Sequence, residues 1–142
     1  MPDPLILDRY AELAVRSGVN VQPGQQLVVT APVEALAFAR LVTEHAYRAG
    51  ASLVTVLYGD DAATLARFRL APDEAFDAAP GWLFAGMAAA YGEGAARLAI
   101  VGEDPALLSG QDPARVARAS RARAIAYRPA AELISGFAIN WS

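Results

Sequence analysis

The sequence predicts an α/β fold, with a mostly parallel sheet of about four strands and helices on both faces. Short continuous apolar runs, as expected for strands covered on both faces, alternate with amphipathic stretches of helical length. This alternation is typical of βαβ units, in which the crossover helices lie over the sheet. No internal repeat or interdomain linker interrupts residues 1–142, so we expect one domain with Rossmann-like layers.

The first predicted helix begins after Asp3. An aspartate caps free backbone N–H groups, and proline, here Pro4, is tolerated at the first helical position. We expect the helix to end at Gly18. Apolar residues that recur at helical spacing predict its buried face, which consists of Ile6, Tyr10, Leu13 and Ala14.

The next elements alternate between strand and helix. Residues 27–31, "LVVTA", form a short apolar run that predicts a strand covered on both faces. An amphipathic helix is expected over residues 32–49, with Gly50 as its stop. Residues 52–59, "SLVTVLYG", predict the second strand.

The second half continues the pattern. Asp60 or Asp61 is expected to cap a helix that runs to Leu70, a short helical piece follows Pro72, and a helix covers residues 81–94. Residues 97–102 predict the third strand.

Two Asp-Pro pairs predict further helix starts. Asp104-Pro105 opens a short piece, and Asp112-Pro113 opens a helix to about Ser135 with a bend near Pro129. "FAINW" would be a fourth strand, on which we expect Trp141 to pack against an apolar face.

Composition excludes several classes of function. The net charge of −3 gives no basic surface for nucleic acid or for an anionic membrane, and no apolar run is long enough to span a bilayer. The sequence has no cysteine, so it offers neither a disulfide nor a thiolate. The start is acidic and lacks the features of a signal peptide. We therefore expect a cytoplasmic protein.

Candidate site residues follow the predicted strands. No G-x-G-x-x-G or G-x-x-x-x-G-K-[ST] motif is present, so a dinucleotide or phosphate-loop site is not expected. Asp60, Asp61 and Glu103 follow strands, and such carboxylates could hold Mg²⁺ or Mn²⁺. The simpler interpretation is that Asp60 or Asp61, and also Asp104, cap helices.

Two further features have structural interpretations. His45 is the only histidine and is expected near the apolar stripe of its helix, where no second histidine or cysteine could join it at a metal. A basic cluster on the last helix could bind an anion or a partner, but a solvated surface is the simpler interpretation. The cluster consists of Arg115, Arg118, Arg121 and Arg123.

Several segments together resemble one known family. They are residues 10–51, "YAELAVRSGVNVQPGQQLVVTAPVEALAFARLVTEHAYRAGA", residues 67–82, "RFRLAPDEAFDAAPGW", residues 112–124, "DPARVARASRARA", and the final "NWS". Their order and spacing resemble the amino-terminal region of the aminopeptidase T and aminopeptidase S family of thermophilic-type metallo-aminopeptidases. The resemblance covers nearly the whole chain.

The resemblance implies a two-domain, homodimeric hydrolase that removes amino-terminal residues from peptides. Two divalent metal ions, zinc, cobalt, manganese or magnesium, would be held by a carboxy-terminal domain that is absent here. Residues 1–142 would then form the amino-terminal domain, which shapes substrate access and dimer assembly and is inactive alone. No catalytic, cofactor-binding or metal-binding residue of the family maps onto this sequence.

Two other interpretations stay open. The chain could be a free-standing, non-catalytic α/β binding or assembly module. Alternatively, it could carry a small-molecule or metal site at the strand ends, built from Asp60, Asp61 and Glu103.

Overall fold

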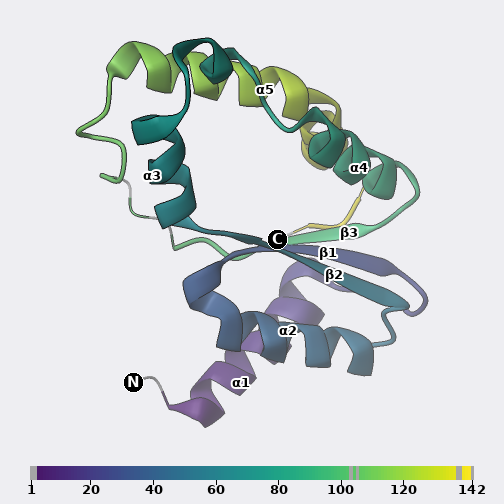
Figure 1. Cartoon of the computed structure of the whole chain (residues 1–142). Coiled ribbons are helices and arrows are strands. Elements are labelled where there is room, and N and C mark those ends of the chain that lie inside the picture. Colours follow the sequence, from purple (N-terminus) through teal and green to yellow (C-terminus); the bar gives the residue numbers. More distant parts are fainter. Residues whose placement is uncertain (1–2, 103, 105, 137–138, 142) are drawn as a thin grey trace.

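The computed structural model describes residues 3–102, 104, 106–136 and 139–141, and it confirms the α/β class. Strands β1 (Gln26–Pro32), β2 (Leu53–Gly59) and β3 (Ala96–Ala99) form a parallel sheet in the order β2-β1-β3. Helices cover both faces of this sheet (Figure 1). The chain passes from β1 to β2 on one side and returns to β3 on the other, so the strand order reverses beside β1.

The layer below the sheet in Figure 1 consists of α1 (Pro4–Leu13) and α2 (Leu36–Arg48). Asp3 caps α1 through a hydrogen bond from the Leu5 backbone N–H to its carboxylate, 2.9 Å long. A π-helical segment, η1 (Ala14–Val19), extends α1, and a 3-10 turn, η2 (Val33–Ala35), precedes α2. The first helix therefore passes the predicted stop at Gly18 and ends before Asn20, which adopts the left-handed conformation with φ 57°.

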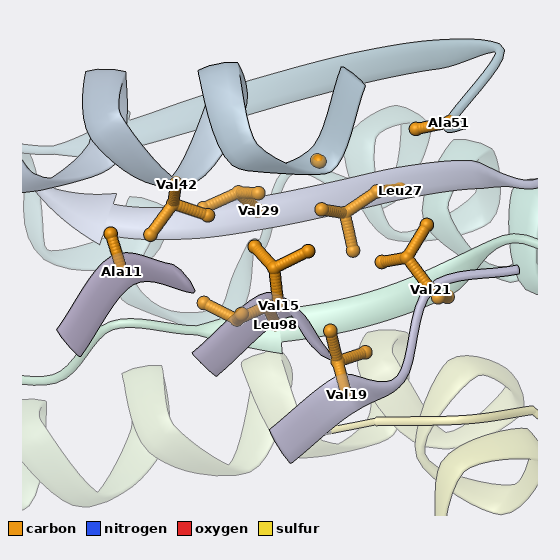
Figure 2. Packing of buried hydrophobic residues seen from close by; sticks show 11 residues of the cluster. Ala11, Val15, Val19, Val21, Leu27, Val29, Val42, Ala51 and Leu98 are labelled. Atoms are coloured by element: carbon orange, nitrogen blue, oxygen red, sulfur yellow. The ribbon is translucent and has the colours of Figure 1, made fainter. Parts of the chain in front are cut away.

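The larger hydrophobic core lies between this layer and the sheet (Figure 2). Leu27 and Val29 of β1 point into it and are fully buried, together with Val15 and Val42 of the helical layer. The residue between them on the strand, Val28, joins the core on the opposite face. The central strand is thus covered on both sides, as its continuous apolar run predicts.

The predicted buried face of the first helix is wrong for three of its four residues, whereas the fourth, Ala14, is partly buried and packs against the core. Ile6, Tyr10 and Leu13 are between 50% and 59% exposed, whereas Ala11 is fully buried against the sheet. Apolar residues occur on two sides of this helix, so periodicity alone does not decide which side packs.

The layer above the sheet contains α3 (Asp61–Leu70), η3 (Asp73–Asp77), α4 (Gly81–Gly92) and α5 (Pro113–Ser135). Helix α5 continues through Pro129 as one element, and it packs along α4 and η3. Residues 106–110 form turns with i→i+3 hydrogen bonds, so the helical piece predicted after Asp104 is wrong for this described segment. Within the described residues, no helix is both long and apolar enough to cross a membrane.

The fourth predicted strand is represented by a single parallel bridge between Trp141 and Arg97, and Phe137 and Ala138 lie outside the described residues. The Arg97 backbone N–H donates to the Asn140 carbonyl at 3.0 Å, which places the tail beside β3. Ile139 is buried at 7% exposure, whereas Trp141 is 41% exposed. The tail is therefore anchored through Ile139, whereas Trp141 is partly covered, and its packing against an apolar face stays a prediction.

Candidate functional site

A groove lies at the carboxyl ends of the strands, between the sheet and the upper helices. Its cavity of about 690 Å³ is lined by the ends of β1 and β2, the segment after β3, and side chains of α4 and α5. A second cavity of about 740 Å³ opens between α3, η3, α4 and α5. The two cavities share five lining residues, which are Thr64, Leu83, Phe84, Leu108 and Arg123. In open α/β sheets, ligands bind where the strand order reverses, and this groove lies there.

Two of the three predicted site residues line this groove. Asp60 accepts a hydrogen bond from the Ala62 backbone N–H at 3.0 Å and so caps α3, as the simpler interpretation of the sequence predicts. Asp61 is the first residue of α3 and also lines the cavity. Glu103 lies outside the described residues.

The carboxylates that line the groove do not form a metal site in the described part of the chain. Asp104 lines the cavity and accepts a hydrogen bond from the Ala106 backbone N–H at 2.9 Å. No group of three or more His, Asp or Glu side chains that could hold a metal ion occurs among the described residues. Asp60 and Asp104 each satisfy a backbone N–H, which is the role of a cap.

Arg97 is the groove residue that the sequence analysis missed. It lies on β3 between the buried Ala96 and Leu98, and because side chains alternate along a strand, it points away from Leu98 toward the upper layer. Its Nε atom is buried and has no close hydrogen-bond partner among the described residues. The available signal was an arginine inside the otherwise apolar run "ARLAI", since a charge in a buried strand requires an explanation.

Aromatic side chains surround Arg97 and the groove floor. The Tyr91 hydroxyl is also buried. Burial raises the pKa of Tyr91 to about 12, with a further increase from Tyr127, although the charge of Arg97 and a hydrogen bond with its side chain oppose the shift. The Tyr127 ring meets the Phe84 ring edge-on at 5.4 Å between centroids, and the Arg123 guanidinium lies 5.6 Å from the Phe84 centroid.

His45 lies in the lower layer and is the only histidine of the sequence. Its side chain is 4% exposed, and its Nε2 atom lies 2.9 Å from the Asp8 carboxylate. The Glu12 carboxylate is 3.9 Å from Nδ1. Asp8 and Glu12 belong to α1 and His45 to α2, so this group connects two helices on the face of the sheet opposite to the groove. The structural interpretation of His45 agrees with these contacts.

Two arginines of the predicted basic cluster, Arg115 and Arg118, form ion pairs with aspartates and are therefore not free to bind an anion. Arg118 donates to both carboxylate oxygens of Asp77, at 3.0 and 2.9 Å, and also to Asp73. Arg115 donates to Asp73 at 3.1 Å and lies 5.3 Å from the centroid of the Phe76 ring. These contacts fasten η3 to α5. Because the paired carboxylates are exposed, these contacts are compatible with the solvated face that the sequence predicts, to which they add specific ion pairs.

Acid is expected to weaken the η3–α5 contact. The hydrogen bond from Arg118 holds the pKa of Asp77 below its usual value of 3.8. Because the folded-state pKa is the lower one, the stabilisation is present above the unfolded-state pKa and is lost as pH falls through the folded-state pKa. We expect Arg118→Gln to unfold more easily than wild type at neutral pH, with the difference shrinking below about pH 4.

This expectation can be checked by urea denaturation at several pH values. Arg128→Gln is a suitable control, because Arg128 is exposed on the same helix and makes no ion pair among the described residues. A difference between Arg118→Gln and wild type that stays constant from pH 7 down to pH 2 would contradict the assigned role of Asp77.

Comparison with known families defines the class of protein. The sequence model of a family described as "Thermophilic metalloprotease (M29)" matches residues 5–142 of this chain. The chain belongs to this M29 family of metallopeptidases.

Individual relatives and a solved structure make the assignment more specific. The chain is 53% identical to Aminopeptidase T of Thermus thermophilus over 136 residues, which are 96% of this chain and 33% of that protein. It is 39% identical to Aminopeptidase AmpS of Bacillus subtilis, with the same coverage of both chains. The solved structure of wild-type AmpT from Thermus thermophilus matches with a TM-score of 0.93 over 96% of this chain and 34% of that one. The chain thus spans about a third of the length of these relatives and corresponds to their amino-terminal part.

Proposed function

We propose that residues 1–142 form the amino-terminal α/β domain of a metal-dependent aminopeptidase that removes amino-terminal residues from peptides. The 53% identity to Aminopeptidase T, together with the TM-score of 0.93 to wild-type AmpT, carries this proposal. The catalytic domain would be the part of the relatives that this chain does not cover. In the cytoplasmic homodimer that we propose, this segment shapes substrate access and subunit assembly.

The residues of this chain that the structure describes do not fit the two-metal site of such an enzyme. Two-metal hydrolysis needs several carboxylate or imidazole ligands that hold both ions roughly 3.5–4 Å apart. Asp60 and Asp104 cap backbone N–H groups, and His45 lies on the other face of the sheet. The zinc, cobalt, manganese or magnesium ions of the intact enzyme would therefore be bound outside the described part of this chain.

A free-standing, non-catalytic binding or assembly module is the second candidate. The observation that favours it is the groove, because a cavity at the strand-order reversal is a binding feature that needs no metal. A third candidate is a strand-end metal site that combines Asp60 and Asp61 with Glu103, which is not among the described residues.

The chain alone is expected to show no hydrolysis of amino-acid anilides or dipeptides. The expected result holds with or without added zinc, cobalt, manganese or magnesium, because no metal-binding group occurs among its described residues. A chimera that joins this chain to the remaining two thirds of Aminopeptidase T of Thermus thermophilus is expected to hydrolyse the same substrates. The matched controls are the intact relative and its carboxy-terminal two thirds without any amino-terminal partner.

The same assay separates the three candidates. An inactive chimera beside an active intact relative would contradict the aminopeptidase proposal and favour the independent module. Turnover by the chain alone that disappears in Asp60→Asn and Asp61→Asn would instead establish the strand-end metal site. Calorimetric titration of the chain with each metal ion provides an independent measurement of that site.

A further inference from the structure

Strand β2 forms one edge of the sheet, and this edge is uncovered within the described part of the chain. The sheet order is β2-β1-β3, so β2 has a neighbouring strand on one side only. At the opposite edge the tail lies beside β3, where the Arg97 backbone N–H donates to the Asn140 carbonyl at 3.0 Å. Among the described residues, no backbone group of another segment bonds to the outer side of β2. An unpaired strand edge of this kind is a template for a further strand.

The hydrogen bonds of the sheet show which backbone groups of β2 point outward. The Ile100 N–H donates to the Thr30 carbonyl at 2.8 Å, so the even-numbered residues of β1 face β3 and its odd-numbered residues face β2. In the parallel register, the odd-numbered residues of β2 therefore bond to β1. The residues whose N–H and C=O groups point away from the sheet are Val54, Val56 and Tyr58.

One of these outward groups already has a partner. The Tyr47 hydroxyl accepts from the Val54 N–H at 3.0 Å, which agrees with the outward direction of that N–H. The N–H groups of Val56 and Tyr58 have no hydrogen-bond partner among the described residues. The open part of the edge thus extends from the Val54 carbonyl to Tyr58.

Strand β2 also lacks the features that protect exposed edges. Edge strands are commonly guarded by charged side chains, by proline or by a bulge. Leu53–Gly59 contains neither a charged residue nor proline, and its register with β1 continues over its whole length without a bulge. Leu53 and Tyr58 are 50% and 43% exposed. The composition of this edge therefore favours pairing over exposure to solvent.

A second copy of this chain fits the edge, because β2 is complementary to itself. A twofold axis at Val56 brings two β2 strands together in antiparallel order. Val56 of one copy then lies opposite Val56 of the other, and Val54 lies opposite Tyr58, so the outward-facing residues meet in register. The facing side chains are β-branched or aromatic, which form favourable cross-strand pairs. No like charges face each other, because the strand carries no charge.

We propose that two copies of this chain pair through β2, antiparallel about Val56, so that one sheet continues through both copies. The two Val56 residues exchange N–H···O=C hydrogen bonds, and the Tyr58 N–H donates to the Val54 carbonyl of the second copy. The Tyr47 hydroxyl keeps the Val54 N–H out of this pairing and so limits its strength. This contact gives the homodimer of the proposed function one defined surface, but it rests on β2 and requires no catalytic activity.

Sedimentation and hydrogen exchange of the unaltered chain test the proposal. We expect a monomer–dimer equilibrium in which exchange of the Val56 and Tyr58 N–H groups is slower in the dimer than in the monomer. The N–H groups of Thr55 and Leu57, which face β1 in both states, are the internal control. A chain that stays monomeric at millimolar concentration would overturn the proposal, as would a dimer in which Val56 and Tyr58 exchange as fast as in the monomer.

A single cysteine tests the register of the two strands. The chain has no cysteine, so Val56→Cys supplies one thiol in each copy. Across the twofold axis the two Cα atoms would lie about 5.5 Å apart, which permits a disulfide. Val54→Cys is the matched control, since Val54 is also half-buried and lies on the same face of the strand. Its two thiols would be separated by roughly 13 Å along the strand direction.

Under mild oxidation, Val56→Cys is expected to form a disulfide-linked dimer at least about tenfold faster than Val54→Cys, because only its thiols meet without rearrangement. Equal rates for the two variants, or no disulfide in folded Val56→Cys, would contradict the proposed pairing. The anilide assay of the chimera reports separately on the proposed aminopeptidase function, so failure of one proposal is distinguished from failure of the other.

Discussion

Replacing Phe76 by alanine is expected to lower the free energy of unfolding by about 3–5 kcal/mol. Phe76 is fully buried although it lies on a short 3-10 segment, η3. Its ring stacks on that of Phe68 with centroids 5.2 Å apart, and Arg67 and Arg115 each lie within 5.6 Å of its centroid. Phe76 is thus the centre of a small cluster that holds η3 between α3 and α5.

The loss is large because removal of the ring leaves a cavity in a small cluster. Among the described residues, the cluster contains two other well-buried residues, Phe68 and Ala119, and the Phe68 ring would lose its stacking partner. Two arginines lose the ring face against which they lie. Since domains of this size are stable by only about 5–15 kcal/mol, this one substitution removes a large share of the total.

Urea denaturation followed by far-ultraviolet circular dichroism measures the effect. Phe76→Leu retains most of the apolar volume and is expected to be markedly less destabilising than Phe76→Ala. Trp82→Ala, at a large aromatic side chain that is 80% exposed, is expected to change the free energy by no more than about 0.5 kcal/mol. Equal stability of Phe76→Ala and wild type would show that this cluster does not hold η3 in place.

Replacing Asn140 by aspartate is expected to lower the free energy of unfolding by about 2–3 kcal/mol. The side-chain amide of Asn140 donates to the carbonyls of Val19 and Asn20 at 2.9 and 3.0 Å. It also donates to the Gln25 side-chain oxygen at 3.1 Å, while the Gln25 side-chain amide donates back to the Asn140 oxygen. An aspartate has no N–H group, so it would place a carboxylate against three acceptor oxygens.

The substitution acts on the contact between the carboxy-terminal tail and residues 19–25. Asn140 connects the tail beside β3 to the segment between η1 and β1, more than a hundred residues away in the sequence. Besides the stability loss, we expect faster hydrogen exchange of the Arg97 backbone N–H, which donates to the Asn140 carbonyl. Asn20→Asp is the matched control, because the Asn20 side chain is exposed, and its expected loss is below about 1 kcal/mol. Equal losses in the two variants would contradict the assigned role of Asn140.

Local signals in the sequence predicted most elements correctly. The apolar run "LVVTA" predicted a strand covered on both faces, and β1 is the central strand. The pair Asp60 and Asp61 predicted one helix start and Asp112 another, and the structure shows Asp60 and Asp112 capping their helices through side-chain hydrogen bonds. These features depend on neighbouring residues in the chain, because a cap or a buried run is formed by a few consecutive residues. They are therefore visible without the rest of the fold.

The candidate site was predicted only in part. Its position at the strand ends and the lining by Asp60 and Asp61 follow from the order of the elements. Arg97 was not predicted. A single charged residue in a short apolar strand does not show which face of the sheet its side chain occupies until the layers above and below the strand are known. The pairing of Arg118 with Asp77 was missed for a similar reason, since it joins residues that are 41 positions apart.

The sequence alone determined the α/β class, the succession of helices and strands, and the family to which the chain is similar. The tertiary structure decided which face of α1 is buried, that Ile139 anchors the tail, and that Arg97 faces the groove. The physical reason is the range of the interactions involved. Caps and apolar periods are formed within a few residues, whereas burial of a helix face, strand pairing of a tail and enclosure of a charge depend on segments that meet only when the chain has folded.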